Sequence, residues 1–181
     1  MDDGIHRIGS DPNRPPVDDM DPVRRLRGQL NAPVTVWTTY ADDRSQIGIT
    51  VSSLLIAEGD TPSIMGLISP LSDFWDAVQV TKRFIVHVLS ADQVDIAERF
   101  ALRYPGDLFE GLSTTRSDHG PLLEDVPTRA KCSVTAQLEA GWSTLLKGAL
   151  EEATATEDPP LPLVHYRGHY LTLGARDRPS K

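Results

Sequence analysis

The sequence predicts a mostly β domain, either a barrel or a sandwich, with a few peripheral helices. Seven or eight segments are rich in β-branched and aromatic residues, which favour strands. Only three segments have the residue spacing of an amphipathic helix, and polar or glycine-containing turns separate most of the elements. Many short strands with few helices are typical of barrels and sandwiches.

The expected domain covers residues 21–175, with a flexible segment at each end. Residues 1–20 are rich in aspartate and proline and have no apolar periodicity. Such a segment buries too little apolar surface to offset the entropy lost on ordering, so we expect an acidic tail without fixed structure. Residues 176–181 are expected to form a flexible C-terminus.

The first expected element is a helix that begins at Pro22. Asp21 supplies a carboxylate at the N-cap, and proline is favoured at the first helical position. Val23, Leu26 and Leu30 follow at positions i, i+3 and i+7, which predicts one apolar stripe buried against the domain. A proline at position 33 ends this helix.

Strands and two more helices are expected to follow. One helix begins at Ser69, which precedes a proline, and has Phe74 on its inner face. The other begins at Ser90, because Gln93 stands three residues later, the spacing of a capping box. A polar, proline-rich loop is expected over residues 153–162. The expected strands are residues 34–40, 47–56, 63–68, 84–89, 131–138, 142–150, 163–166 and 169–173.

Composition and charge exclude several classes of protein. The chain has 181 residues, 18 basic against 26 acidic, and a net charge of −8, the wrong sign for a nucleic-acid groove. Its dense basic run, Arg24, Arg25 and Arg27, is better explained as a solvated helix face than as a phosphate groove. No apolar run reaches the about 18 residues of a membrane span. Without a signal-peptide pattern and with a single cysteine, we expect a cytoplasmic protein.

Searches for common catalytic patterns return nothing. The sequence has no GxSxG elbow of a hydrolase and no GxGxxG or GxxxxGKS/T phosphate loop. His165 and His169 on one strand would stand about 13 Å apart, too far to share an ion, so we expect no metal site. Cys132 lies within a predicted strand, and we expect a small buried hydrophobic residue rather than a nucleophile.

Two hydroxyl-rich stretches are candidate binding sites. Ser69 and Ser72 stand at a helix start, where unpaired backbone N–H groups and the positive end of the helix dipole can hold a phosphate. An ordinary N-cap explains the same residues, and Asp73 would repel an anion. Thr50 and Ser52 share one face of a strand, either as ladder-side hydrogen bonds or as the polar lining of a ligand groove.

Seven motifs occur in order along the chain. They are PVTVWTT at 33–39, GITVSS at 48–53, DTP at 60–62, KRFIVHVLSADQ and IAERF within 82–100, GDLFEG at 106–111, GPLL at 120–123 and PLVHYRGHY at 162–170. In this order they resemble the flavin reductase-like family, and especially an actinobacterial branch of it. The resemblance covers about residues 22–173 and implies the FMN-binding split β-barrel fold.

The resemblance also implies a function. Family members typically hold a flavin, usually FMN with FAD as the alternative, in a groove near the interface of a homodimer. They pass a hydride from NADH or NADPH to the flavin N5, and some hand the reduced flavin to a separate monooxygenase. Carried over by position, Thr50, Ser52 and Ser53 would meet the isoalloxazine edge and the ribityl chain. Ser69 and Ser72 would meet the phosphate.

The chain departs from the family pattern at several positions. His87 stands where the family has an asparagine, and we keep it as a candidate cofactor-binding residue. Ser143 stands where the family has a histidine that helps to place the nicotinamide. The loop from Ser69 to Ser72 has fewer hydroxyls than the family motif and no basic residue. Trp142 either covers the flavin or belongs to the core.

Three functions follow from these observations. The leading hypothesis is an FMN-binding oxidoreductase of the flavin reductase type, which transfers a hydride from NAD(P)H to flavin. The alternatives are a non-catalytic flavin- or ligand-binding protein on the same fold, and a relative that uses a deazaflavin. The departures from the family pattern bear on catalysis and leave the fold expectation unchanged.

Overall fold

The computed structural model describes residues 5–6, 21–101 and 106–173 and consists mostly of strands. The strands in chain order are β1 (Ile5–His6), β2 (Ala32–Pro33), β3 (Thr35–Tyr40), β4 (Gln46–Val51), β5 (Leu54–Ala57), β6 (Ser63–Ile68), β7 (Arg83–Val88), β8 (Thr114–Arg116), β9 (Pro121–Leu123), β10 (Arg129–Ala140), β11 (Ser143–Thr154), β12 (Leu163–Tyr166) and β13 (His169–Thr172). The helices are α1 (Pro22–Gly28), α2 (Asp73–Thr81) and α3 (Val94–Ala101). The predicted mostly β class is confirmed.

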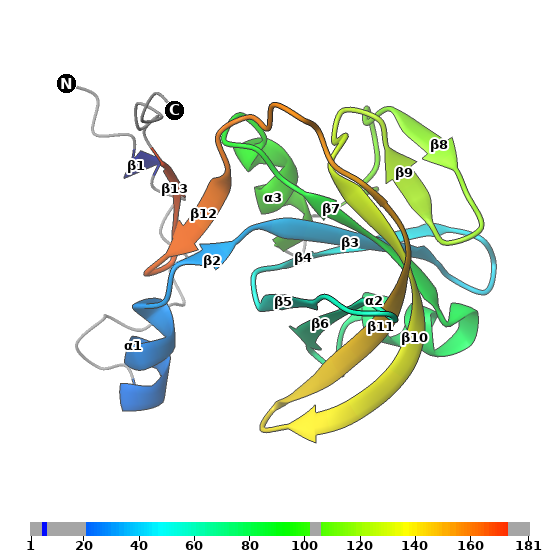
Figure 1. The fold of residues 1–181 in the computed structure, drawn as a ribbon, viewed down its shortest axis with the longest axis horizontal. Coiled ribbons are helices and arrows are strands. Elements are labelled where there is room, and N and C mark those ends of the chain that lie inside the picture. Colours follow the sequence, from blue (N-terminus) through cyan, green and yellow to red (C-terminus); the bar gives the residue numbers. More distant parts are fainter. Residues whose placement is uncertain (1–4, 7–20, 102–105, 174–181) are drawn as a thin grey trace.

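One large sheet organises the molecule. Its seven strands lie in the order β4-β3-β7-β10-β11-β6-β5, and the sheet curls around the main core (Figure 1). A four-stranded sheet, β1-β13-β12-β2, lies beside it, and β8 and β9 form a separate hairpin. Neighbouring strands in all three sheets run antiparallel. None of the three described helices is both long enough and apolar enough to cross a membrane.

The predicted strand 47–56 is interrupted at Ser52 and Ser53. β4 ends before them and β5 begins after them, so the two edge strands of the large sheet follow each other in the chain. The Ser53 Oγ accepts a hydrogen bond from the Leu67 N–H at 3.0 Å and donates one to the Leu67 carbonyl at 3.2 Å. The Ser53 side chain thereby makes the two hydrogen bonds to Leu67 of β6 that a backbone partner would make in a continuous strand. This explains the break between β4 and β5.

Four short strands, β1, β2, β8 and β9, were not predicted. Each strand of the β8–β9 hairpin has three residues, too few to carry a recognisable alternation. Within the predicted N-terminal tail, Ile5 and His6 form β1 and pair with Leu171 and Tyr170 of β13. The rest of that tail and the predicted C-terminal segment 176–181 lie outside the described residues.

Helix α1 begins as predicted but is not buried as predicted. The Asp21 carboxylate accepts a hydrogen bond from the Val23 N–H at 2.8 Å, and proline occupies the first turn. The apolar stripe is exposed, because Val23, Leu26 and Leu30 are 72%, 64% and 62% accessible. The periodicity identified the stripe, but no other part of the described chain covers it.

Helix α3 follows a capping interaction that the sequence only partly predicted. The Gln93 Oε1 accepts a hydrogen bond from the Ser90 N–H at 3.0 Å, as the capping-box spacing indicates. The Ser90 hydroxyl instead donates to the Asp92 carboxylate. Gln93 also donates to the Asp125 carbonyl at 2.6 Å, which ties the start of α3 to the loop after β9.

Three aromatic rings form the centre of the main core. Trp37 stacks on Phe84 with ring centroids 4.9 Å apart, and Phe74 of α2 meets Trp37 edge-on at 6.2 Å. Two glycines make room for these rings. A Cβ added to Gly66 of β6 would lie 2.7 Å from the Trp37 ring, and one added to Gly148 of β11 would lie 2.7 Å from the Phe84 ring.

His87 is part of the buried structure that joins three strands. It has no accessible surface, its Nδ1–H donates to the Val36 carbonyl of β3 at 3.2 Å, and its Nε2 accepts from the Leu123 N–H of β9 at 3.1 Å. The Nε2 can accept a hydrogen bond only when the ring is neutral, so the two bonds together require the neutral ring. Burial, which disfavours the charged imidazolium, lowers the pKa of His87 to about 4.

The glycine at position 66 gives a first prediction. We expect Gly66→Ala to lower the free energy of unfolding by about 1–3 kcal/mol, the usual cost of overpacking a core. The Trp37 ring cannot yield easily, because Phe84 is stacked against it. Urea unfolding measures the loss. Gly28→Ala is the control, since its Cβ would meet nothing closer than 3.9 Å, and an equal loss in both variants would contradict the account.

The His87 ring predicts a specific pH dependence of stability. The unfolded chain binds a proton on this ring below about pH 6.5, whereas the folded chain does so only near pH 4. The neutral His87 ring therefore makes its full contribution to the free energy of unfolding above about pH 6.5. This contribution decreases as the pH falls from there toward 4, by up to about 1.4 kcal/mol per pH unit. In His87→Asn this component should disappear from urea titrations at pH 7, 6 and 5. The same slope in both proteins would show that other groups cause it.

Candidate functional site

Serines from three segments of the chain lie around the end of β6. Thr144 of β11 pairs with Ile68 of β6, so the next residues on the two strands, Ser143 and Ser69, stand opposite each other at the end of the ladder. Ser53 reaches the same edge through its two hydrogen bonds to the β6 backbone. We call the group Ser53, Ser69, Ser72 and Ser143 the serine corner.

Helix α2 begins later than predicted, with Ser72 rather than Ser69 as its N-cap. The Ser72 Oγ accepts a hydrogen bond from the Trp75 N–H at 3.2 Å and donates one to the Ser69 carbonyl at 2.7 Å. The Ser69 Oγ accepts from the Leu71 N–H at 3.3 Å. Both serines therefore shape the loop that leads into the helix, and the prediction misplaced the cap because either hydroxyl suits that position.

The donors at the serine corner fit a phosphate group. The Ser69 side chain is exposed, and the first N–H groups of a helix have no partner within it. The positive end of the α2 dipole points the same way. Residues 69–73 contain no lysine or arginine, and Asp73 and Asp76 lie in the first turn of the helix. The hydrogen-bond donors therefore suit an anion, while the local charge predicts that it binds weakly.

Two of the predicted cofactor-binding residues do not join the serine corner. The Thr50 Oγ1 donates to the Ala97 carbonyl at 2.7 Å and so ties β4 to α3. His87 is enclosed in the core with both ring nitrogens bonded to backbone groups. These hydrogen bonds give both residues a structural role. Ser52 is half-buried in the turn beside Ser53.

The outer side of β10, β11, β6 and β5 is largely apolar. Two rows of side chains cross these strands: Leu138–Leu145–Leu67, and Ala136–Lys147–Met65–Leu55. Within them Leu138, Leu67 and Leu55 are 64%, 41% and 67% exposed. We call these seven residues the outer sheet face. Sequence reasoning missed this surface, because alternation along one strand does not reveal which strands are its neighbours.

Two large apolar side chains stand exposed beside the serine corner. Trp142, at the tip of the β10–β11 hairpin, is 91% exposed, and Leu71, in the loop before α2, is 89% exposed. Gly141 adopts a φ of 60°, which allows the hairpin to turn tightly. The interpretation of Trp142 as a core residue is therefore wrong. Its place next to Ser143 leaves the indole available to cover a ligand.

A polar cluster on the surface of β10 and β11 lacks the arrangement of a nucleophile. One oxygen of the Glu151 carboxylate accepts a hydrogen bond from the Ser133 hydroxyl, and the other bonds to the His119 Nε2 at 2.8 Å. These two hydrogen bonds lower the pKa of Glu151. Because the carboxylate separates the serine from the histidine, His119 cannot act as a base toward Ser133.

Cys132 is a buried hydrophobic residue, as predicted. Its side chain has no accessible surface and lies in the main core. Burial raises the pKa of the Cys132 thiol to about 12, so the reactive thiolate is not formed near neutral pH. This residue carries no chemistry for the site.

An open depression of about 420 Å³ lies near the other end of α2. Arginines at positions 44, 83 and 116 and the side chains of Tyr40 and Thr81 contribute to its lining. Because α2 has nine residues, about 14 Å of helix separates this depression from the serine corner. None of the seven candidate residues from the sequence lines it, so the serine corner is the stronger candidate site.

Comparisons with known proteins give a consistent result. A family model described as "Flavin reductase like domain" matches residues 27–174. Reductase subunit HsaB of a flavin-dependent monooxygenase from Mycobacterium tuberculosis is 31% identical over 154 residues, covering 83% of this chain and 80% of that protein. An NADH:riboflavin 5'-phosphate oxidoreductase of Streptomyces pristinaespiralis is 30% identical, with coverages of 90% and 92%.

The solved structures extend the comparison to the fold. Nitrilotriacetate monooxygenase component B of Mycobacterium thermoresistibile superposes on 88% of this chain and 89% of its own, with a TM-score of 0.79 and 27% identity. Flavin reductase PheA2 in its native state superposes with a TM-score of 0.75 at 25% identity, covering 86% of this chain and 100% of its own. With a family match across most of its length, this chain belongs to the flavin reductase-like family.

Proposed function

We propose that this protein is an NAD(P)H-dependent flavin reductase that binds FMN at the serine corner. The observation that carries the proposal is the placement of four serines around the end of β6, in a chain of the flavin reductase-like family. Relatives named NADH:riboflavin 5'-phosphate oxidoreductase and flavin reductase (NADH) support the reaction.

The groups around the serine corner divide the work of binding. Ser69 and the first N–H groups of α2 bind the phosphate, and the hydrogen bonds of Ser72 hold that loop in shape. Ser53 and Ser143 offer hydroxyls at the edge of the ring system. Trp142 and Leu71 are exposed in the free chain and exclude water by covering the ring. The flavin, when bound, supplies the redox chemistry as acceptor of a hydride from the nicotinamide.

Hydride transfer needs positioning rather than an acid or a base. The chain must hold the nicotinamide with its reacting atom about 3–3.5 Å from the flavin. Ser143 stands at the family's histidine position and offers a shorter side chain for this task. We therefore expect slow turnover and a high KM for the nicotinamide, without loss of the reaction itself.

FMN suits the serine corner better than FAD does. The loop has few hydroxyls and no cation, which matches a single phosphate more closely than a pyrophosphate. Weak binding also suits a flavin that is a diffusing substrate.

Relatives named as monooxygenase reductase subunits support a separate monooxygenase as the acceptor of the reduced flavin. We place the protein in the cytoplasm, where NAD(P)H is available, as a homodimer whose contact covers the outer sheet face.

Ser69→Ala tests the phosphate position. We expect the variant to bind FMN about 5- to 30-fold more weakly, the loss of one hydrogen bond to a charged group. Riboflavin has no phosphate, so its affinity should stay unchanged in the same fluorescence titration. Thr50→Ala is the control, because that hydroxyl is bonded to α3 and should affect neither ligand. Equal losses for FMN and riboflavin would place the anion elsewhere.

The reaction is tested by following NADH and NADPH oxidation with added FMN. We expect a rate above that of buffer, with a high KM, and a gain of about tenfold in kcat/KM for Ser143→His, which restores a larger positioning side chain. FMN binding without oxidation of either nicotinamide would refute the reductase. The non-catalytic binding protein or the deazaflavin-using relative would then be the better explanation.

A further inference from the structure

Three arginines from three separate elements line the depression near the C-terminal end of α2. Arg44 lies in the turn between β3 and β4, Arg83 is the first residue of β7, and Arg116 is the last residue of β8. Within the described residues, their guanidinium groups make no hydrogen bond and no ion pair. Each guanidinium offers five N–H donors in a planar fork that matches phosphate oxygens, so the depression holds many unused donors for an anion.

Glu151 interacts with Arg83 through its charge but does not occupy the guanidinium group. Its pKa is lowered first by hydrogen bonds with Ser133 and His119, and further by the positive charge of Arg83. One carboxylate oxygen bonds to the Ser133 hydroxyl and the other to the His119 Nε2. Because no hydrogen bond joins this carboxylate to Arg83, the arginine donors stay available to a ligand.

The β8–β9 hairpin, which forms one wall of the depression, is fixed to the large sheet. The Thr38 hydroxyl of β3 donates to the Pro121 carbonyl at 2.8 Å, and the Ser117 hydroxyl donates to the Gly120 carbonyl at 2.7 Å. A Cβ added to Gly120 would lie 2.7 Å from the Thr38 carbonyl oxygen, so the two backbones are in direct contact. The backbone that carries Arg116 is therefore ordered before a ligand arrives, which lowers the entropy cost of binding.

The β3–β4 turn holds Arg44 in a backbone conformation that arginine rarely adopts. Its φ is 68°, in the left-handed region. The Arg44 N–H donates to the Ala41 carbonyl at 2.9 Å, and the Ala41 N–H donates to the Ser45 carbonyl at 2.9 Å. Glycine, asparagine or aspartate suits this conformation better, so a strained arginine here indicates that its charged side chain has a use.

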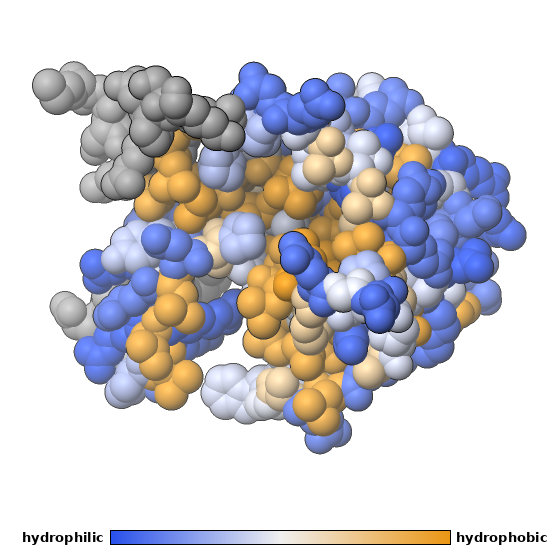
Figure 2. Space-filling view, viewed as in Figure 1, coloured by the Kyte–Doolittle hydropathy of each residue, from blue (hydrophilic) through white to orange (hydrophobic). Residues whose placement is uncertain are grey.

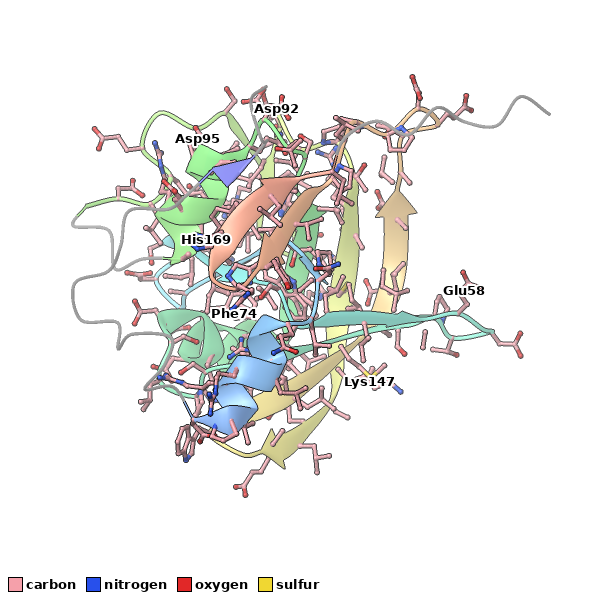
Figure 3. The ribbon with its side chains drawn as sticks, turned by 90° about the vertical axis from the view of Figure 1, so that its left-hand side faces the viewer. Glu58, Phe74, Asp92, Asp95, Lys147 and His169 are labelled. Carbon is pink, nitrogen blue, oxygen red and sulfur yellow. The ribbon has the colours of Figure 1, made fainter. Side chains whose placement is uncertain are left out.

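The arginines place positive charge on an otherwise acidic protein. The chain has a net charge of −8. Figure 2 shows hydrophilic residues gathered on the side of the molecule where the β8–β9 hairpin and the β3–β4 turn lie. The acidic residues Glu58, Asp92 and Asp95 lie on other elements, in the β5–β6 loop and at the start of α3 (Figure 3). The local field therefore attracts a small anion to the depression.

We propose that this depression binds a nucleoside phosphate, at a site separate from the serine corner. The arginines bind the phosphate through bidentate, charge-assisted hydrogen bonds. Asp42 and Asp118 also line the depression, and their carboxylates accept hydrogen bonds from the sugar hydroxyls. Tyr40 lines it as well, and its ring packs on the base. The volume of about 420 Å³ lies within the range of about 300–1,000 Å³ that is usual for small-molecule sites.

Calorimetric titration of the full chain with AMP, and with adenosine, which lacks the phosphate, tests the site. We expect adenosine to bind about tenfold or more weakly than AMP. Arg83→Gln and Arg116→Gln should each weaken AMP binding by about tenfold or more, because charge-assisted hydrogen bonds to the phosphate are lost. Arg25→Gln is the matched control, since it removes the same charge from exposed α1, on the opposite side of the molecule from the β8–β9 hairpin (Figure 1), and should leave AMP binding unchanged.

Three results would overturn the proposal. They are a chain that binds no AMP, equal affinities for AMP and adenosine, and an equal loss of AMP binding in Arg25→Gln and Arg83→Gln. Displacement of AMP by riboflavin would overturn the separation of the two sites, because the flavin ring would then occupy the depression. All the substituted arginines are exposed, so we expect the variants to keep the unfolding temperature of the parent chain.

Two sources can supply this ligand, a free nucleotide or the ADP half of NADH or NADPH, and the second rests on the proposed function. If the ADP half binds here, Arg83→Gln raises the KM for the nicotinamide with little change in kcat. If a free nucleotide binds here, this KM stays unchanged. Both results support the site. A chain that binds AMP through these arginines but oxidises no nicotinamide refutes the reductase and leaves the site standing.

Discussion

The register of β6 against β11 is the constraint on which both the core and the site depend. On the inner side, Gly66 and Gly148 leave the space that Trp37 and Phe84 occupy. On the outer side, the same register sets Ser143 opposite Ser69. A slip of one residue would turn every side chain of one strand to the other face, which would fill the aromatic core and separate the serines. The core and the candidate site therefore depend on the same alignment.

The sequence predicted most elements because each leaves a local signal. The Asp21 cap, the β-branched strands and the reach of Gln93 to Ser90 all depend on residues close in the chain. The features that the sequence could not predict depend on contacts between residues that are far apart in the chain. The break at Ser53 arises from bonds to Leu67 on another strand, and the exposure of the α1 stripe depends on what covers it. Periodicity shows that one side of a helix is apolar, but it does not show which surface packs against that side.

The candidate site also combines features that the local sequence predicted with features that depend on how distant strands pair. Ser69 and Ser72 stand at a helix start that the sequence identified. The sequence predicted Ser69 as the N-cap, whereas the N-cap in the structure is Ser72. The Thr50 hydroxyl donates to the Ala97 carbonyl of α3, a contact between distant segments that alternation along one strand does not reveal. Ser143 and Trp142 came from the resemblance, and only the pairing of β11 with β6 places them beside the other serines.

The central claim is that FMN lies at the serine corner, and a crystal structure of the protein grown with FMN tests it most directly. The account predicts density for the phosphate against Ser69 and the first N–H groups of α2, with the ring beside Ser53 and Ser143. Flavin density in the arginine-lined depression near Thr81, at the other end of α2, would contradict it.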